Sequence, residues 1–282
     1  PNTTTTVMTI AYRIMKPEDI VAGLSLCRSA RWNQLQRDWE IFLSLGPRDC
    51  RVALAEEKIV GTVTTISYDR AFSWIGMVLV DPDYRRMGIG KGLLEEALHI
   101  LASEETVKLD ATPDGRQVYL KLGFKDEYPL SRMSAIIEQE KLTASTARPM
   151  RQEDLEAIAQ FDKEFFGANR EPLLRWLFEG APQYAFVMEG PGGIQGYCLG
   201  RKGFNFMQIG PIVAEHTKIA QELASAALGS CIGQPVILDV LHHHTEWLAW
   251  VIETGFVEQR PFIRMFHGLN RFPGIPEKQF AI

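Results

Sequence analysis

Apolar and polar residues alternate along several short segments of the first 140 residues, a pattern that predicts half-buried β-strands. Two of these segments flank the EEK sequence at residues 56–58 and predict a hairpin. The strands expected in this part of the chain cover residues 9–15, 50–56, 58–68, 73–80, 107–111 and 129–137.

Apolar residues at helical spacing lie between these strands. The pattern predicts helices over residues 17–30 and 33–45, with Pro17 suited to a helix start. Leu93, Leu94, Ala97, Leu98 and Leu101 share one face of a further helix, and DGRQVYLKL predicts a fourth. A strand, two helices, three strands and then alternating helices and strands predict an α+β domain around one mixed sheet.

The chain then repeats itself. RIMKPEDI, which begins at Arg13, matches RPMRQEDL, which begins at Arg148, at a separation of 135 residues, and LGFKDEYPLSRM from Leu122 matches TGFVEQRPFIRM from Thr254 at 132. The polar segment between the repeats predicts a linker. We therefore expect two tandem domains, residues 1–140 and 146–282, each a mixed, mostly antiparallel sheet flanked by helices.

The second half supplies its own set of expected elements. Helices are predicted at residues 152–162, 217–229 and 245–253, a hairpin at 184–200, and strands at 204–214, 235–240 and 262–268.

Composition narrows the class of protein. A formal net charge of -5 over 282 residues argues against an extended surface for nucleic acid or anionic membrane. The N-terminal PNTTTTVMTI lacks the features of a signal peptide, and the longest apolar run, residues 74–80, is too short to span a bilayer. We expect a cytoplasmic protein with neither nucleic acid nor membrane as partner, and the pattern leaves the oligomeric state open.

Neither cysteines nor histidines predict a metal site. The four cysteines are far apart and lack Cys-x-x-Cys spacing, so buried reduced thiols are expected. His242, His243 and His244 are consecutive, and adjacent side chains on a strand diverge, which makes it difficult for all three to reach one ion. A polar loop between a strand and a helix is the favoured interpretation, and the function of the three histidines stays open.

The stretch DPDYRRMGIGKGLLEEAL, residues 81–98, carries the clearest chemical signal. Gly88, Gly90 and Gly92 permit a tight turn and close approach of backbone N–H groups to an anion at a helix N-terminus. Arg85, Arg86 and Lys91 add charged donors, and a pyrophosphate is the anion that fits best.

Two familiar nucleotide motifs do not match this stretch. A P-loop requires Ser or Thr after Gly-Lys, but Gly92 follows Lys91. A dinucleotide fingerprint requires a glycine where Leu93 stands and an acidic ribose ligand further on. A glycine-rich turn that binds nothing is the structural alternative.

RRMGIG at residues 85–90 resembles the Arg/Gln-x-x-Gly-x-Gly signature of the GCN5-related N-acetyltransferase (GNAT) superfamily, which binds the pyrophosphate of acetyl-CoA. The preceding IGMVLV and the later LLEEAL and YLKLGF are similar to this superfamily in order and spacing. WNQLQRDW and the tandem second half resemble a bacterial subgroup with two such domains in one chain.

The resemblance implies a site and a reaction. Backbone groups of Val78 and Val80 would hold the pantetheine and polarise the acetyl carbonyl, and Tyr119 would protonate the departing thiolate. The expected function is acetyl-CoA-dependent N-acetyl transfer to the primary amine of a small molecule by direct attack in a ternary complex. An acyl-CoA-binding sensor or interaction module without turnover is the alternative. The residues implied for the cofactor are Val78, Leu79, Val80, Arg85, Arg86, Met87, Gly88, Ile89, Gly90 and Lys91.

The second half lacks the two features that the reaction needs. Ile75 and Gly76 align with Ile209 and Gly210 at a separation of 134, whereas the following helices align at 130, so four residues are lost (134 - 130). The remaining EHTKIAQE has no glycine, and Val251 occupies the position of Tyr119. We expect a degenerate GNAT-like domain without the acetyl-CoA pyrophosphate loop, which braces the first domain or closes over its acceptor cleft.

The acceptor region is predicted where the two early helices meet the sheet. Aromatic faces with carboxylates suit a cationic amine. Trp39, Phe42 and Leu43 also follow helical core spacing, so packing is an equal interpretation for Trp39. Asp110 and Asp239 share a Leu-Asp context and are expected to be structural, which leaves Asp69 or ordered water as the base. The substrate-binding candidates are Trp32, Asn33, Gln34, Asp38, Asp69 and Trp74.

Overall fold

The computed structural model describes residues 8–282 and divides into two compact units. The first unit contains residues up to 67 together with 73–107, and the second contains 68–72 together with 108–282. We use "first half" for residues 1–140 and "second half" for 146–282, because the two units do not coincide with the two sequence repeats. Residues 1–7, on which the signal-peptide interpretation largely depends, lie outside the described part.

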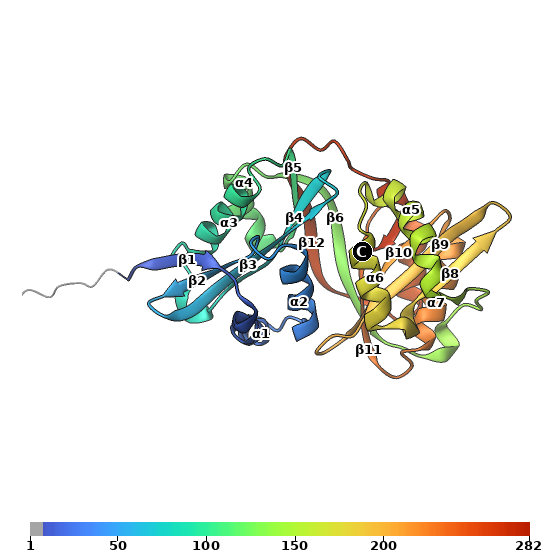
Figure 1. The fold of residues 1–282 in the computed structure, drawn as a ribbon. Coiled ribbons are helices and arrows are strands. Elements are labelled where there is room, and N and C mark those ends of the chain that lie inside the picture. Colours follow the sequence, from blue (N-terminus) through green and yellow to red (C-terminus); the bar gives the residue numbers. More distant parts are fainter. Residues whose placement is uncertain (1–7) are drawn as a thin grey trace, which may run out of the picture. The chain divides into compact units, whose positions relative to one another are not determined.

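The first unit is built on strands β1 to β4 (Figure 1). β1 pairs antiparallel with β2, and β2 pairs antiparallel with β3. The elements are β1 (Ile10–Ile14), η1 (Pro17–Asp19), α1 (Ile20–Ser29), α2 (Gln36–Leu45), β2 (Arg51–Ala55), β3 (Lys58–Tyr68), β4 (Phe72–Val80), η2 (Pro82–Tyr84) and α3 (Ile89–Ile100).

The core of the first unit contains a fully buried tryptophan on α2. Trp39 packs with Met15, Cys27 and Met77 in one apolar cluster. A Cβ atom on Gly23 of α1 would lie 2.9 Å from the Trp39 ring, so the absent side chain permits the two helices to pack closely. Trp39 is therefore a packing residue, which decides between the two interpretations of its helical spacing.

The second unit carries the remaining strands and helices. They are β5 (Thr106–Ala111, in this unit from Lys108), α4 (Pro113–Lys121), β6 (Lys125–Ile136), η3 (Gln139–Lys141), β7 (Arg148–Pro149), η4 (Gln152–Asp154), α5 (Leu155–Phe166), α6 (Glu171–Gly180), η5 (Pro182–Tyr184), β8 (Phe186–Gly190), β9 (Gly193–Arg201), β10 (Met207–Ala214), α7 (Thr217–Gly229), β11 (Pro235–Leu241), α8 (Thr245–Glu253), β12 (Val257–Gly268), η6 (Pro276–Lys278) and β13 (Gln279–Ala281).

The two halves exchange their last strands. The sheet runs in the order β5-β12-β6-β11-β10-β9-β8-β7, and β6 pairs antiparallel with both β11 and β12. β6 and β12 are the equivalent strands of the two repeats, and Figure 1 shows them side by side. Thus β12 of the second half lies beside β5, and β6 of the first half lies beside β11.

The fold class expected from the sequence is confirmed, because a wide mixed sheet is flanked by helices. Several elements were not predicted from the sequence, among them α6, the two-residue strand β7 and β13. EPLLRWLFEG has a strongly amphipathic pattern with proline at its start and was a readable signal for α6. Three residues are too few for a periodic pattern, so β13 gave no comparable signal.

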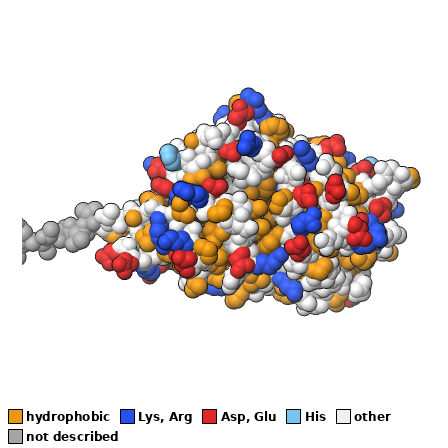
Figure 2. Space-filling model, viewed as in Figure 1, with side chains coloured by type: hydrophobic (Ala, Val, Ile, Leu, Met, Phe, Trp, Pro, Cys, Tyr) orange, Lys and Arg blue, Asp and Glu red, His pale blue; other side chains and the backbone are white. Residues whose placement is uncertain are grey.

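The charge of the surface and the length and hydrophobicity of the helices are relevant to the expected absence of nucleic-acid and membrane partners. On the face shown in Figure 2, acidic, basic and apolar side chains are interspersed, without a large patch of one charge. Among residues 8–282, no helix is long and apolar enough to cross a membrane.

Candidate functional site

The glycine-rich stretch of the first unit connects the end of β4 to the start of α3. Two contacts hold Asp81, the first residue of this stretch. Its side chain accepts a hydrogen bond from the Asp83 amide at 3.0 Å and forms an ion pair with Lys58 at 2.9 Å. The Lys58 ammonium lowers the pKa of Asp81 and also lies 5.0 Å from the centre of the Tyr84 ring. These contacts fix the direction in which the chain leaves the sheet.

The turn itself contains two residues in the left-handed region. Arg86 has φ = 62°, and Gly88, the N-cap of α3, has φ = 79°. No side chain caps the helix, and a Cβ on Gly88 would meet nothing within 4 Å. A Cβ on Gly90 would meet only Val80, at 3.7 Å. Uncapped amides in such a turn form a concave site for an anion.

Positive charge surrounds this helix start. Arg85, Arg86 and Lys91 are exposed, and Lys91 reaches Glu95 one turn later at 3.7 Å. Within the described residues, neither arginine has an ion-pair partner, so both guanidinium groups are available to an anion. The helix dipole adds to their attraction.

Gly92, the third glycine, packs closely against Tyr12. A Cβ at this position would clash with the Tyr12 hydroxyl oxygen, so glycine permits this packing, and the expected role of Gly92 beside an anion stays a prediction. Leu79 and Ile89 are also buried, so these two members of the predicted cofactor set can contribute only through their backbone.

One residue of β4 has a backbone conformation that was not anticipated from the sequence. Met77 has φ = 51°, and the Thr62 hydroxyl of the neighbouring strand donates to the Met77 carbonyl at 2.8 Å. Non-glycine residues in the left-handed region are uncommon, and they cluster at functional sites. Val78 follows Met77 directly, and Val80 ends the strand, so Met77 lies directly before the backbone predicted to bind a cofactor. A methionine in this conformation leaves no signal in sequence patterns.

Tyr119 lies on α4 in the second unit. Its ring packs against Phe124 with centroids 5.9 Å apart and lies next to Gly115, where a Cβ would approach the ring to 3.0 Å. Burial raises the pKa of the Tyr119 phenol to about 12, so it stays protonated at neutral pH. Among the described residues its hydroxyl has no hydrogen-bond partner, which leaves the proton available for a bound substrate.

The acceptor candidates of the first unit form one group along the chain. Trp32, Asn33 and Gln34 occupy the connection between α1 and α2, with Gln34 Oε1 buried and without a hydrogen-bond partner. Asp38 is buried in the first turn of α2 and accepts a hydrogen bond from the Leu35 amide at 2.6 Å. Its carboxylate therefore stabilises the helix start.

The two remaining acceptor candidates are in different units. Trp74 is half-buried on β4 in the first unit. Asp69 belongs to the second unit, where it is exposed at a hairpin turn with φ = 52° and lies 3.4 Å from Lys163. The structure thus gives Asp69 a cationic partner on α5.

The three consecutive histidines point to three different neighbours. His242 lies 2.6 Å from the Ser131 hydroxyl, His243 packs edge-on against Tyr128, and His244 stacks on Phe280. No group of three His, Cys, Asp or Glu side chains in residues 8–282 could hold a metal ion.

An uncapped, glycine-rich helix start follows a strand that contains a left-handed residue, as expected for the acyltransferase fold that the sequence motif resembles. Two family models match this chain: residues 17–124 match the acetyltransferase (GNAT) family, and residues 158–281 match an acetyltransferase (GNAT) domain. The chain belongs to the GNAT family, contains two such domains in tandem, and is an acyltransferase.

Curated relatives and solved structures agree. The chain is 24% identical to holothin acyltransferase of Pseudoalteromonas sp. (strain SANK 73390), over 84% of this chain and 81% of that protein. It is 25% identical to the uncharacterized N-acetyltransferase YitH of Bacillus subtilis (strain 168), over 85% of each chain.

Among solved structures, a putative acetyltransferase of Pyrococcus horikoshii has a TM-score of 0.81 at 21% identity, over 100% of this chain and 97% of that one. A tandem GNAT protein from the clavulanic acid biosynthesis pathway has a TM-score of 0.63 at 13% identity, over 92% and 98%.

Proposed function

We propose that the first half binds acetyl-CoA at the start of α3 and transfers its acetyl group to the primary amine of a small molecule. The observation that carries this proposal is the turn at Gly88: two left-handed residues, an uncapped helix N-terminus, and two exposed arginines that form no ion pair among residues 8–282. A pyrophosphate supplies the negative charge that this arrangement attracts. GNAT proteins in general use acetyl-CoA.

The proposed reaction is an acetyl transfer assisted by a small number of protein groups. The amine nitrogen forms a bond to the acetyl carbon, the carbon–sulfur bond breaks, the nitrogen loses a proton and the thiolate gains one. Backbone N–H groups after Met77, whose φ is positive, polarise the carbonyl, in the manner of an oxyanion hole. Tyr119, protonated at neutral pH, donates to the leaving sulfur. We assign no base, because Asp69 already has Lys163 as partner.

The proposal for the acceptor draws on position and on one relative. Trp32, Asn33, Gln34 and Trp74 are proposed to line the acceptor site, with the buried Gln34 Oε1 as a hydrogen-bond acceptor for an N–H group. The relative that acylates holothin supports a small molecule as acceptor. Residues 146–282 are proposed to lack acyl-CoA binding and to support the catalytic first half.

Isothermal titration of acetyl-CoA into the intact protein tests this division. We expect one acetyl-CoA site per chain. Gly90→Glu should abolish this site, and Gly90→Ala should keep it. A screen of small primary amines for CoA release then tests turnover. Two equivalent sites would refute the assignment to the first half, and binding without CoA release across the screen would favour a sensor.

A further inference from the structure

A short strand near the end of the described chain fills a gap in the second unit's sheet. β10 pairs in parallel with β11 only at its start, through Met207 and Gln208. Further along β10, β13 pairs antiparallel with it, through Ile212 and Val213. On the other side of β13, the Ile282 amide donates to the Asp239 carbonyl of β11 at 3.0 Å. β13 therefore occupies the groove where β10 and β11 separate.

The sequence repeat identifies this groove. At the separation of 134 residues, Val78 on β4 corresponds to Ile212 on β10, and both strands are irregular just before these positions. Met77 has φ = 51°, and the register of β10 shifts between Ile209 and Ile212. In the described chain no additional short strand joins β4, whereas β13 joins β10.

We propose that residues 276–282 are a built-in peptide ligand of the second half. β13 lies along β10 at the place that the extended pantetheine arm takes along β4. The comparison with β4 rests on the proposed function, whereas the occupation of β10 by β13 does not. The groove of the second half is accordingly a site for an extended peptide strand, held by the chain's own segment.

The contacts of the segment are those of a specific ligand. Phe280 is 1% exposed, its ring stacks on His244 at 4.5 Å and meets the Trp247 ring edge at 5.4 Å. The Trp247 indole N–H donates to the Phe280 carbonyl at 2.8 Å, and the Gln279 side-chain amide donates to the Phe165 carbonyl at 2.6 Å. The groove thus recognises one backbone carbonyl, one side-chain amide and one aromatic ring of the segment.

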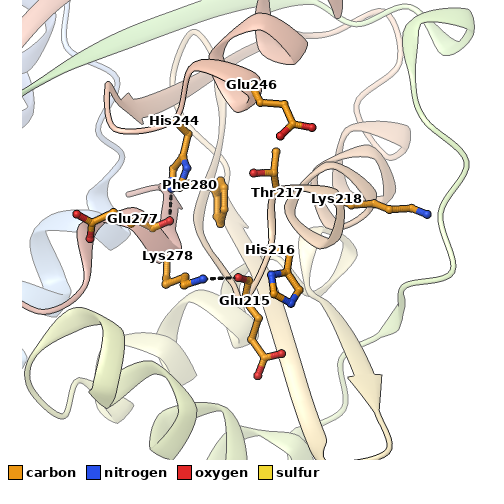
Figure 3. A pocket seen from close by; sticks show the side chains of 9 residues that line it. All are labelled: Glu215, His216, Thr217, Lys218, His244, Glu246, Glu277, Lys278 and Phe280. Carbon is orange, nitrogen blue, oxygen red and sulfur yellow. Dashed lines mark hydrogen bonds between the residues drawn. The ribbon is translucent and has the colours of Figure 1, made fainter.

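The open end of the groove favours a peptide over a cofactor. A cavity of about 380 Å³ remains there, between the starts of α7 and α8 (Figure 3). Glu215, Glu246 and Glu277 line it, Lys218 extends away from it, and Lys278 donates to the Glu215 carbonyl at 2.5 Å. The lining mixes three carboxylates with two lysines and two histidines, and residues 215–218 include no glycine, so the open turn with flanking arginines at the start of α3 has no counterpart here.

A peptide added in trans tests the proposal. In the intact protein the tethered segment has an effective concentration near the millimolar range and excludes a competitor. We expect a fluorescein-labelled peptide PEKQFAI to bind the double variant Phe280→Asp, Ala281→Pro at least tenfold more tightly than it binds the unchanged protein. The matched control is Phe272→Asp, because Phe272 is 42% exposed and lies just before residues 276–282. A peptide with aspartate in place of phenylalanine should not bind.

Anisotropy titrations decide between the outcomes. A folded double variant that binds no peptide, or that gains a second acetyl-CoA site, overturns the proposal. If the double variant does not fold, hydrogen exchange on the unchanged protein replaces it: saturating acetyl-CoA should leave the amides of residues 279–281 as protected as before. Faster exchange there would show displacement of β13 by the cofactor and overturn the proposal. Failure of acetyl-CoA to bind anywhere would refute the proposed function and leave the peptide result standing.

Discussion

Arg264 of the second half forms a doubly hydrogen-bonded ion pair with Asp110 of the first half, at 2.8 and 3.0 Å. The equivalent residues of the two repeats form a second such pair, in which the arginine comes from the first half: Arg132 bonds to Asp239 of the second half, at 2.8 and 2.9 Å. The two pairs thus join the exchanged strands β12 and β6 to their new neighbours. Each repeat carries the same arginine and the same aspartate, so the two ion pairs hold each exchanged strand in register with its neighbour but do not by themselves select which strand lies beside β5.

Removal of Arg264 should destabilise the protein strongly. Its side chain is 5% exposed and also donates to the Tyr128 hydroxyl at 2.8 Å. Loss of one partner from a buried ion pair costs roughly 3 to 5 kcal/mol because the other charge stays unpaired. We expect Arg264→Ala to lower the free energy of unfolding by about this amount in urea titrations.

The control for this prediction is an exposed ion pair of the same unit. Arg116 bonds to Asp126 with side chains 30% and 41% exposed, and Arg116→Ala should change the free energy of unfolding far less than Arg264→Ala does, because solvent screens the exposed pair. The replacement of both Arg264 and Asp110 by apolar residues of similar volume should restore much of the loss. Equal effects of Arg264→Ala and Arg116→Ala would show that the crossed pair does not secure the strand exchange.

The strand exchange marks the limit of what the sequence could predict about the fold. Alternation and helical spacing located most strands and helices, because each pattern reports which face of one element is buried. The choice between β6 and β12 as neighbour of β5 is different. The two strands share the Pro-x-x-Arg-Met pattern at Pro129 and Pro261, so either can fill the same place. Only contacts between distant residues decide between them.

Gly90→Glu should abolish acetyl-CoA binding without loss of stability. The added Cβ meets only Val80, at an ordinary 3.7 Å, and a carboxylate in the first turn of α3 interacts favourably with the helix dipole. The same carboxylate repels a pyrophosphate. We expect at least a hundredfold weaker binding by calorimetry, with an unchanged melting temperature. Gly90→Ala adds the Cβ without the charge and should bind almost normally, and equally weak binding in both variants would point to sterics instead of charge.

Tyr119→Phe should lower kcat about 10²- to 10⁴-fold while acetyl-CoA affinity stays nearly unchanged. The native phenol has its pKa raised from 10.0 to about 12 by burial, so it is protonated across the neutral range. An alkaline decline in rate caused by loss of this proton should not appear below about pH 11, since the folded-state pKa sets the window. Steady-state kinetics over pH 6 to 10 on both proteins check this, and an unchanged kcat in the phenylalanine variant would assign Tyr119 to packing alone.

Some features of the candidate site could be predicted from the sequence and others could not. The glycines and arginines of residues 85–90 form a local motif, and such a motif can be recognised in a single sequence. The left-handed Met77 accepts a hydrogen bond from Thr62, fifteen residues earlier, and left no local signal. The packing of Gly92 against Tyr12 also joins residues that are distant in the sequence, so it could not be predicted.

The four cysteines should be unreactive in the native protein. All are buried, and burial raises the pKa of Cys50 and of Cys231 to about 11, so few thiolates exist at pH 8. We expect no reaction with Ellman's reagent over minutes at pH 8, and four reactive thiols after denaturation. Rapid labelling of any one cysteine in the native protein would contradict the described core.

The buried pair of Lys108 and Glu127 makes a pH-dependent prediction. The two side chains are 4% and 7% exposed with Nζ and Oε1 3.1 Å apart, and desolvation lowers the pKa of Lys108 although Glu127 opposes the change. A lysine whose pKa is lowered in the folded state binds fewer protons when folded. The free energy of unfolding therefore rises as the pH increases from the folded-state pKa to the unfolded-state pKa of this lysine. Glu127→Gln removes the opposing anion and should lower that pKa further.

We therefore expect Glu127→Gln to lose stability at pH 6 and to regain part of it by pH 9, relative to the unchanged protein. At pH 6 the variant must bury an uncompensated ammonium or release its proton, and both cost free energy. The double variant Lys108→Met, Glu127→Leu removes both charges and should show neither the loss nor the pH dependence. Chemical denaturation at pH 6, 7.5 and 9 separates the cases. A loss in Glu127→Gln that is independent of pH would mean that Glu127 acts through its contact with Asn270 instead of through the charge of Lys108.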